Sequence, residues 1–436
     1  MIFAPPNLRL GASRLLRRAA RAAALPLVAA GLAAATVPAH AVPSYARQTG
    51  MDCSGCHVGA FGPQLTPAGI RFKLEGYTET DGKSGKVPLS GMVVATATRT
   101  REDQNPAPEH LKSNDNVKID EASIFLAGRL GENFGSFMQV THSGIDHSTA
   151  LDQMDLRWAM PVKLGGRDTI VGLTLNDNPT VQDPFNTLPV WGAPYVGPEA
   201  GFGTGEAGTL INGGLEQRVL GLSAYTLWDK SLYAELGTYR SLSPTMQARL
   251  GLDRDSQRLG GNTYWRLAWM GDQKVQAYSV GIFGWDAKLA PDRSGGTPQD
   301  HYRDLGLDAS YQFLGTREHV ATVNASVIRE RLSPGDGSPA TKLYESRLAA
   351  GYSWRHTWGG SAVLFDTHGD DPAAATRGQM FQVDWTPWGK EGAEAPSPFG
   401  WANLRLGLQW WRYERFGGEP SPHDHDTISL FAWTAF

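Results

Sequence analysis

The sequence predicts an all-β fold, a sixteen-stranded antiparallel outer-membrane β-barrel with a small α-helical segment at its N-terminus. Three observations support this prediction. Short runs of alternating apolar and polar residues recur along most of the chain, the connections between them alternate between short and long, and the last residue is the aromatic Phe436. The composition agrees, because 51 glycines and 14 tryptophans against two cysteines describe an aromatic, turn-rich β protein.

Each predicted strand has one apolar and one polar face. In the run 305–313, apolar residues occupy every odd position and polar or small residues every even one, which is the period of a β-strand. A soluble β-sandwich is the alternative, but strands with apolar faces outside and polar faces inside do not suit a packed sandwich. The sixteen runs begin near residues 89, 118, 134, 151, 168, 215, 231, 262, 275, 303, 318, 340, 358, 377, 401 and 427.

The connections provide an independent test of the barrel. Only residues 131–133 separate the second and third runs, and only 229–230 separate the sixth and seventh, whereas 101–117 and 177–214 are long. Short turns on one side and long loops on the other are typical of outer-membrane barrels. The connection 389–400 is an exception, because it is long where a turn is expected. The loop 177–214 is long enough to fold inward as a constriction.

The first residues predict export. Five arginines between positions 9 and 21 precede the apolar run 22–37, and Ala39-His40-Ala41 provides a small-x-small cleavage site. A transmembrane anchor is the alternative, but a short run that ends in a cleavage motif favours a removed signal peptide over residues 1–41. No later run of about 18 apolar residues predicts a spanning helix. The net charge of −4 gives no reason to expect nucleic acid as a partner.

The mature chain opens with a Cys-x-x-Cys-His motif at Cys53, Cys56 and His57. Two thiols at this spacing match the two vinyl groups of a haem, and the histidine that follows is placed to be the proximal iron ligand. A thioredoxin-like redox pair would need a βαβ context, and a zinc site would need two further ligands. Because both cysteines of the exported chain lie in this motif, it predicts one covalent haem c.

The haem segment is predicted to span 42–87 and the barrel 88–436. A helix is expected to begin after Thr66 as N-cap, with Pro67 in its first turn. About 45 residues cannot build much core of their own, so this segment is expected to pack against the barrel. The apolar residues available to cover the porphyrin are Ile70, Phe72, Leu74 and Tyr77.

The sixth ligand of the haem iron stays open. Met92 is the candidate that we favour, because it lies near the mouth of the barrel and a methionine opposite a histidine raises the haem potential. Its alternative role is that of an ordinary side chain of the barrel wall. Met51 is too close to the attachment site to reach the opposite face. His142 and His147 are further alternatives, which the topology places toward the extracellular end.

With both parts in view, the chain resembles the fused outer-membrane monohaem cytochrome–porin family, whose best-studied members are iron oxidases. The resemblance covers essentially the whole mature chain. It is specific at 45–50 running into the motif at 53–57, at 65–67 and 72–77 behind it, and at 173–186 in the first long loop. It implies a cytochrome plug in a sixteen-strand barrel that resides in outer-membrane lipid. It also implies electron transfer from extracellular Fe(II) to a periplasmic c-type cytochrome or another acceptor, an activity like that of a ferrous iron:cytochrome c oxidoreductase.

Two other functions stay open at this point. One is an outer-membrane redox barrel with a different donor or with outward electron flow, and the other is a diffusion porin with a structural or sensory haem plug. Residues 423–426, with the sequence His-Asp-His-Asp, and His368 with Asp370 and Asp371 could collect iron in extracellular loops. The interpretation that we favour for them is that of solvated loop residues.

Overall fold

The computed structural model describes residues 43–205, 207–389 and 402–436. The predicted signal peptide and most of the exceptional connection 389–400 lie outside the described residues. None of the described helices is long and apolar enough to cross a membrane.

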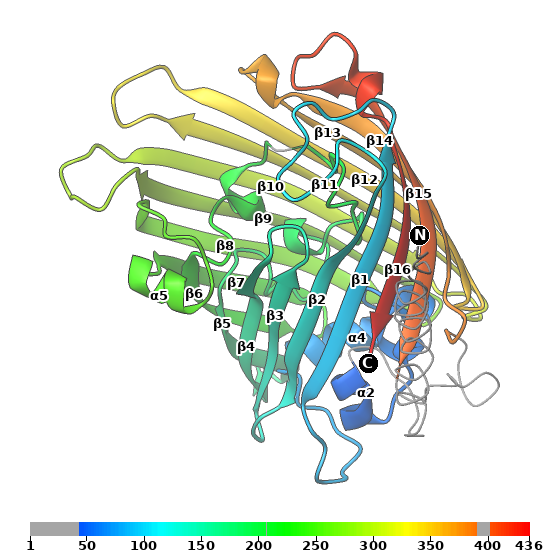
Figure 1. The fold of residues 1–436 in the computed structure, drawn as a ribbon. Coiled ribbons are helices and arrows are strands. Elements are labelled where there is room, and N and C mark those ends of the chain that lie inside the picture. Colours follow the sequence, from blue (N-terminus) through cyan, green and yellow to red (C-terminus); the bar gives the residue numbers. More distant parts are fainter. Residues whose placement is uncertain (1–42, 206, 390–401) are drawn as a thin grey trace, which may run out of the picture.

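Sixteen antiparallel strands form a closed barrel, as predicted (Figure 1). Each strand pairs with its neighbours in the sequence, and β1 pairs with β16 from Met92 opposite Ala435 to Thr100 opposite Thr427. The predicted strand starts differ from the observed ones by at most four residues, at β6 and β8. The strands are β1 Leu89–Thr100, β2 Asn116–Arg129, β3 Phe134–Ser143, β4 Ser148–Leu164, β5 Arg167–Asn176, β6 Val219–Trp228, β7 Leu232–Ser241, β8 Arg258–Asp272, β9 Gln276–Ala290, β10 Asp300–Phe313, β11 His319–Ser333, β12 Thr341–Trp354, β13 Trp358–Gly369, β14 Thr376–Trp385, β15 Asn403–Phe416 and β16 Thr427–Ala435.

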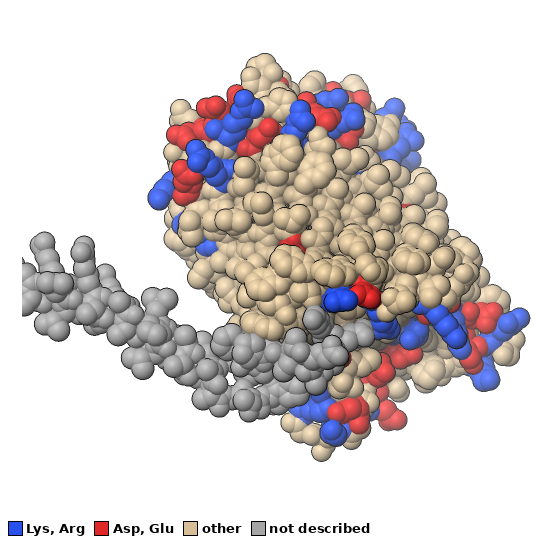
Figure 2. Space-filling model, turned by 90° about the vertical axis from the view of Figure 1, so that its right-hand side faces the viewer, with Lys and Arg blue, Asp and Glu red and all other residues tan. Residues whose placement is uncertain are grey.

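The outer face of the barrel is apolar. In β10, Leu305, Leu307 and Phe313 are exposed, while Asp308 and Gln312 between them point inward and are buried. Figure 2 shows charged side chains gathered mainly near the two ends of the molecule, with a broad band of other residues between them. This is the surface expected of a barrel wall in contact with lipid tails.

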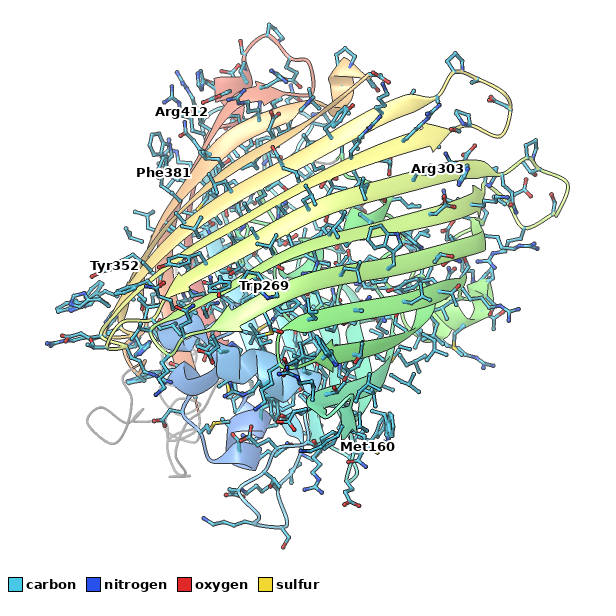
Figure 3. The ribbon with its side chains drawn as sticks, turned by 180° about the vertical axis from the view of Figure 1, so that it is seen from behind. Met160, Trp269, Arg303, Tyr352, Phe381 and Arg412 are labelled. Atoms are coloured by element: carbon cyan, nitrogen blue, oxygen red, sulfur yellow. The ribbon has the colours of Figure 1, made fainter. Side chains whose placement is uncertain are left out.

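Aromatic and basic side chains mark the borders of this band. Figure 3 shows Trp269 and Tyr352 toward the end with the short turns, and Arg303 and Arg412 toward the end with the long loops. Trp269 and Tyr352 are each about half exposed. Aromatic rings at the membrane border form the girdle that is typical of outer-membrane barrels.

The N-terminal helical segment lies at the short-turn end of the barrel (Figure 1). It consists of α2 (Pro43–Thr49), α3 (Cys53–Cys56), the short η1 (Val58–Ala60) and α4 (Pro67–Leu74). The predicted start of α4 is confirmed, because the Thr66 side chain accepts a hydrogen bond from the Gly69 amide and Pro67 is in the first turn. Residues 78–88 then lead directly into β1.

The long connection between β5 and β6 folds into the lumen, as predicted. It contains η2 (Pro189–Trp191) and η3 (Leu210–Gly214), and its residues 177–188 are all buried. Arg266 on β8 joins it to the wall, since its guanidinium lies 3.4 Å from Asp183 of the loop and 2.8 Å from Asp308 on β10. The lumen is therefore occupied by this loop as well as by the helical segment. The other short helices are α5 (Pro244–Arg249), η4 (Pro372–Ala374) and η6 (Pro422–His425) in long connections.

Candidate functional site

The Cys-x-x-Cys-His motif forms a single helical turn that the following loop holds in place. The His57 amide donates to the Cys53 carbonyl at 2.8 Å, and the Thr66 amide donates to the Cys56 carbonyl at 2.9 Å. Gly69 permits this close return of the chain, because a Cβ atom there would lie 2.4 Å from the Cys56 carbonyl oxygen. Both thiols and the imidazole are thus carried on one short, fixed segment.

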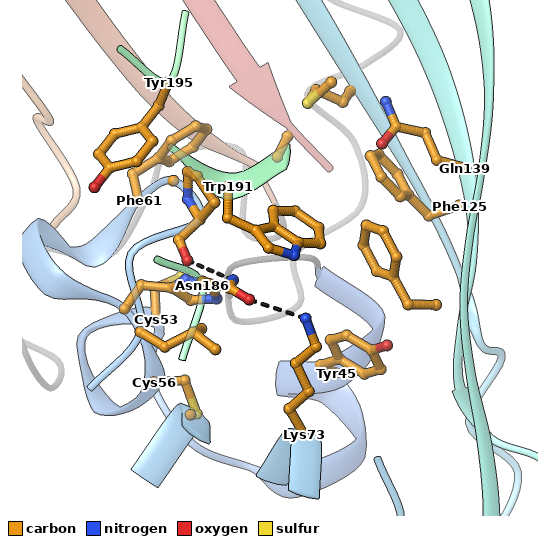
Figure 4. Close-up of a pocket in the computed structure, with 18 of the residues that line it drawn as sticks. Tyr45, Cys53, Cys56, Phe61, Lys73, Phe125, Gln139, Asn186, Trp191 and Tyr195 are labelled. Atoms are coloured by element: carbon orange, nitrogen blue, oxygen red, sulfur yellow. Dashed lines mark hydrogen bonds between the residues drawn. The ribbon is translucent and has the colours of Figure 1, made fainter. Parts of the chain in front are cut away.

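A cavity of about 350 Å³ opens beside this turn, between the helical segment, the barrel wall and the inward loop (Figure 4). Its volume is in the range of small-molecule and cofactor sites. The motif residues share this cavity with aromatic side chains from three parts of the chain. These rings are Tyr45, Phe61, Phe72 and Tyr77 of the helical segment, Phe125, Phe137 and Trp433 of the wall, and Trp191 and Tyr195 of the inward loop.

The motif residues fit a covalently attached haem. Cys53 and Cys56 are not joined in a disulfide, so both thiols are available for thioether bonds. The buried Nδ1 atom of His57 has no hydrogen-bond partner among the described residues. Burial lowers the pKa of His57 to about 4, so its ring is neutral at pH 7 and has a lone pair for a metal. The aromatic wall offers the apolar surroundings that a porphyrin requires.

Lys73 joins the helical segment to the inward loop at the edge of this cavity. Its ammonium donates to the Val181 carbonyl at 2.8 Å and to Asn186 Oδ1 at 2.9 Å, and it lies 4.6 Å from the centre of the Trp191 ring. The Asn186 amide in turn donates to the Pro63 carbonyl at 2.7 Å (Figure 4). The segments 72–77 and 173–186 each carry part of the resemblance noted in the sequence, and the structure brings them into contact.

Asp155 and Arg157 on β4 anchor the same helical segment to the wall. Tyr77 donates to the Asp155 carboxylate at 2.6 Å, and the Arg157 guanidinium lies 2.7 Å from that carboxylate and donates to the Gln182 carbonyl of the loop. Both charged residues are fully buried. This pair was not predicted from the sequence, although two charged residues at inward positions of a predicted strand are a signal that could have indicated it.

The four apolar residues expected to cover the porphyrin divide into two groups. Phe72 and Tyr77 line the cavity. Ile70 and Leu74 do not, because they pack against Tyr225 and other wall residues of β4 and β6–β8 in a separate apolar cluster. The expectation was wrong for these two residues, since the helix has two apolar faces and one of them is needed to fix the segment in the barrel.

Among the candidates for a sixth ligand, Met92 lines the cavity and the two histidines do not. Met92 is 9% exposed and packs in a cluster with Phe125 and Trp433, so its position suits a wall residue as well as a ligand. Met51 also lines the cavity, beside the motif. His142 is exposed, with its Nδ1 atom 2.9 Å from Thr149 Oγ1, and His147 stacks on His110 at the long-loop end.

The histidines of the two extracellular loops have structural contacts of their own. His425 stacks on Phe416 with ring centres 4.0 Å apart, and His368 stacks on Tyr344 at 5.4 Å. His423 lies 3.5 Å from Asp426. In the described parts of the chain, no group of three or more histidine, cysteine, aspartate or glutamate side chains is arranged to bind a metal ion directly.

Replacing Lys73 by methionine is expected to loosen the inward loop. The change removes the Lys73 donor from Asn186 Oδ1 and leaves the Val181 carbonyl with the Trp191 indole as its remaining donor, which costs about 1–3 kcal/mol in the free energy of unfolding. Burial lowers the pKa of Lys73 to about 7, so the wild-type protein gains stability as the pH rises from 7 toward 10.5, the usual lysine value. The deficit of the variant should therefore be larger at pH 10 than at pH 7, which urea unfolding in detergent at both values measures. A deficit that does not change with pH would contradict a buried, titrating Lys73.

Comparisons with known proteins found similar solved structures but no similar sequence. No protein-family model matches the chain, and no curated protein is similar to it in sequence. Similar solved structures include the outer-membrane channel DcaP of Acinetobacter baumannii, with 12% identity over 80% of this chain and 97% of that chain and a TM-score of 0.46. An anion-selective porin from Comamonas acidovorans has 12% identity over 80% of this chain and 98% of that chain, with a TM-score of 0.44. OmpT of Vibrio cholerae has 12% identity over 81% of this chain and 98% of that chain, with a TM-score of 0.42.

The closed barrel and its apolar belt define the class of the protein. A closed sheet of sixteen strands has no free edge, as a membrane-crossing wall requires, and its lipid-facing side chains are apolar. The chain is an outer-membrane β-barrel protein.

Proposed function

We propose that the protein is an outer-membrane electron conduit, which takes electrons from extracellular ferrous iron and passes them to a periplasmic c-type cytochrome. The observation that carries this proposal is the Cys53, Cys56 and His57 motif, located on an aromatic cavity inside a membrane-spanning barrel. Cys53 and Cys56 would hold a haem c covalently and His57 would ligate its iron. Such a haem accepts and releases one electron at a time, so each ferrous ion that gives up an electron leaves as a ferric ion.

The position of the cavity suits this task. The motif lies at the short-turn end of the barrel, which is the periplasmic end in outer-membrane barrels, where a periplasmic carrier could approach it. The lipid bilayer does not conduct electrons, and a redox centre in the lumen shortens the distance over which electrons must be transferred across it. Oxidation of iron outside the cell would also keep insoluble ferric products out of the periplasm.

The contents of the lumen favour a conduit over a diffusion porin. The helical segment and the inward loop contact each other through Lys73 and Asn186 and contact the wall through Asp155 and Asp183. We therefore expect liposomes that contain the protein to leak small solutes poorly, in contrast to liposomes with an open porin.

Anaerobic addition of ferrous iron to the purified, oxidised protein tests the proposal. The haem absorbance should change to that of the reduced form. No reduction at any accessible pH would remove ferrous iron as the donor. A redox titration would then separate the remaining alternatives, because a strongly negative haem potential favours outward electron flow.

Met92→Ala tests the sixth ligand. If the Met92 sulfur ligates the iron, its loss should lower the haem potential, because a methionine axial ligand raises it. The measurement is a spectroscopic redox titration of the variant beside wild type. Met270→Ala is a suitable control, since Met270 is also a buried, inward-facing methionine of the wall but lies outside the cavity lining. Equal potentials in the Met92 variant and wild type would assign Met92 to the wall alone.

A further inference from the structure

A group of carboxylates lies in the cavity on the barrel wall. Glu121 on β2 and Asp152 on β4 both line the cavity, in the halves of their strands that are nearer the long loops. Figure 4 shows Gln139 on the wall, across the cavity from Cys53. Gln139 donates to Thr141 Oγ1 at 3.0 Å, and Thr141 donates to the Asp152 carboxylate at 2.7 Å, so the polar lining is continuous.

Two irregularities in the strand pairing lie at these carboxylates. The pairing of β1 with β2 skips Asp120, and the pairing of β3 with β4 skips Asp152. A β-bulge of this kind turns two consecutive side chains toward the same side and is frequent beside functional sites. Glu121 and Asp152 thus reach the lumen through local departures from the regular barrel.

Asp177 and Glu216, near the two ends of the inward loop, complete the group. Gln153, the neighbour of Asp152, donates to Glu216 at 3.0 Å, and Gln217 donates to Asp152 at 3.0 Å. The negative charges of Asp152 and Glu216 contribute to a raised pKa of Asp177. We call Glu121, Asp152, Asp177 and Glu216 the acidic cluster.

Among the described residues, the acidic cluster has no basic partner in an ion pair. Some other lumenal acids are paired with bases, as Asp155 is with Arg157 at 2.7 Å. None of the ion pairs between described residues includes a member of the acidic cluster. The positive charge of Arg218 lowers the pKa of Glu216, but Arg218 is exposed and its guanidinium lies 3.7 Å from the Asp255 carboxylate.

A second set of lumenal acids has a structural role, because these carboxylates bind backbone amides of the inward loop. Glu330 accepts a hydrogen bond from the Leu210 amide at 2.6 Å, and Asp304 accepts one from the Ile211 amide at 2.8 Å. Those acids hold the loop by its backbone. In the acidic cluster only Asp177 accepts a hydrogen bond from a backbone amide of the described residues, that of Met154 at 2.7 Å, so the other three acids do not hold the loop in this way.

Asp177 has an oxygen with no partner at all among the described residues. Its Oδ1 atom accepts a hydrogen bond from the Met154 amide at 2.7 Å, whereas its buried Oδ2 atom accepts none, and the residue is 1% exposed. The adjacent Asn178 Oδ1 is also buried and unpartnered. Burying a charged carboxylate without a hydrogen-bond donor or a cation beside it costs several kcal/mol of free energy. The unpartnered oxygens therefore indicate a site for a cationic ligand. Burial raises the pKa of Asp177 to about 8 and that of Glu216 to about 7, and an arriving cation would displace the protons they hold.

We propose that the acidic cluster is a docking site for a hydrated divalent cation. The side chains are too far apart for direct coordination by three of them, so the ion would keep most of its water and be held through it. If the proposed function holds, on which this assignment of the ion rests, the cation is the ferrous ion that reduces the haem. Glu121 and Asp152 of the acidic cluster then line the same cavity as the motif, so that the donor site adjoins the acceptor site.

Binding of Mn²⁺ to the full-length, haem-loaded protein in detergent tests the site without any electron transfer. Bound Mn²⁺ is measured by the loss of the electron paramagnetic resonance signal of the free ion. The double variant Glu121→Gln/Asp152→Asn should bind Mn²⁺ about tenfold or more weakly, because two charges that face the ion are removed. The matched control Glu132→Gln/Asp253→Asn removes the same charges from exposed positions outside the cavity and should bind as wild type does. The charge-conserving Glu121→Asp/Asp152→Glu should retain most of the affinity, which separates loss of charge from loss of fold.

Haem reduction provides the second readout. At low ferrous iron concentration the double variant should be reduced about tenfold more slowly than wild type, while reduction by ascorbate, an anion, should not be slowed. Equal Mn²⁺ binding by wild type and the double variant would overturn the site, even if ferrous iron reduces both. Conversely, Mn²⁺ binding that the double variant loses, together with no reduction by ferrous iron in wild type, would support the site and reject the proposed function.

Discussion

Replacing both Cys53 and Cys56 by alanine is expected to abolish covalent haem retention. Thioether bonds survive denaturation, so wild-type protein should show haem staining and peroxidase activity on a denaturing gel, and the double variant should show none. Each single variant should keep at most one of the two bonds and stain more weakly. The expected loss in the double variant is complete, because the described chain has no other cysteine.

Ser54→Ala is the matched control for this experiment. Ser54 lies between the two cysteines, is buried, and its hydroxyl has no hydrogen-bond partner among the described residues. Its replacement leaves both thiols and the turn of α3 intact, so haem staining should be unchanged. Unchanged staining in the Cys53/Cys56 double variant would refute the attachment site and, with it, the electron-transfer function.

The barrel was predictable from the sequence because its signal is local. A strand that faces lipid on one side and polar lumen on the other must alternate, and the run 305–313 does so at every position. The inward position of 177–214 followed from its length, since a loop of that size at the mouth of a barrel has the lumen as its nearest surface to cover. The Cys-x-x-Cys-His motif was equally visible, because its chemistry depends on spacing within five residues.

The cavity was not predictable in the same way because its walls come from distant segments. Lys73 and Asn186 are 113 positions apart, and nothing in the periodicity of either segment indicates the contact. Ile70 and Leu74 looked like porphyrin-covering residues because a helix shows its apolar positions but not which partner each face will meet. The acidic cluster escaped notice for a related reason, since a β-bulge such as the one at Asp152 changes the face of a residue without changing the run around it.

Two glycines with a packing role were also indistinguishable from turn glycines in the sequence. Gly69 allows α4 to approach the Cys56 carbonyl, and Gly135 on β3 allows the helical segment to approach the wall. A Cβ atom on Gly135 would lie 2.3 Å from the Gly76 carbonyl oxygen and 2.9 Å from the Tyr77 Cβ atom. The segment therefore lies against the barrel at a distance that only glycine permits.

Gly135→Val is accordingly expected to push the helical segment away from the wall while the barrel itself stays closed. Valine suits a strand, but its side chain would displace the turn at Gly76 and Tyr77 and break the hydrogen bond from Tyr77 to Asp155. Forcing extra atoms into a packed interface costs about 1–3 kcal/mol, so amide hydrogen exchange in α2 and α4 should quicken by roughly 5- to 150-fold. The haem spectrum should change as well, because the cavity depends on the same contact. Gly261→Val is the control, since a Cβ atom there meets nothing within 4 Å, and it should leave exchange in both helices as in wild type. If the Gly135 variant keeps wild-type exchange and a wild-type spectrum, the helical segment does not depend on the barrel wall, and the two parts are better described as independent domains.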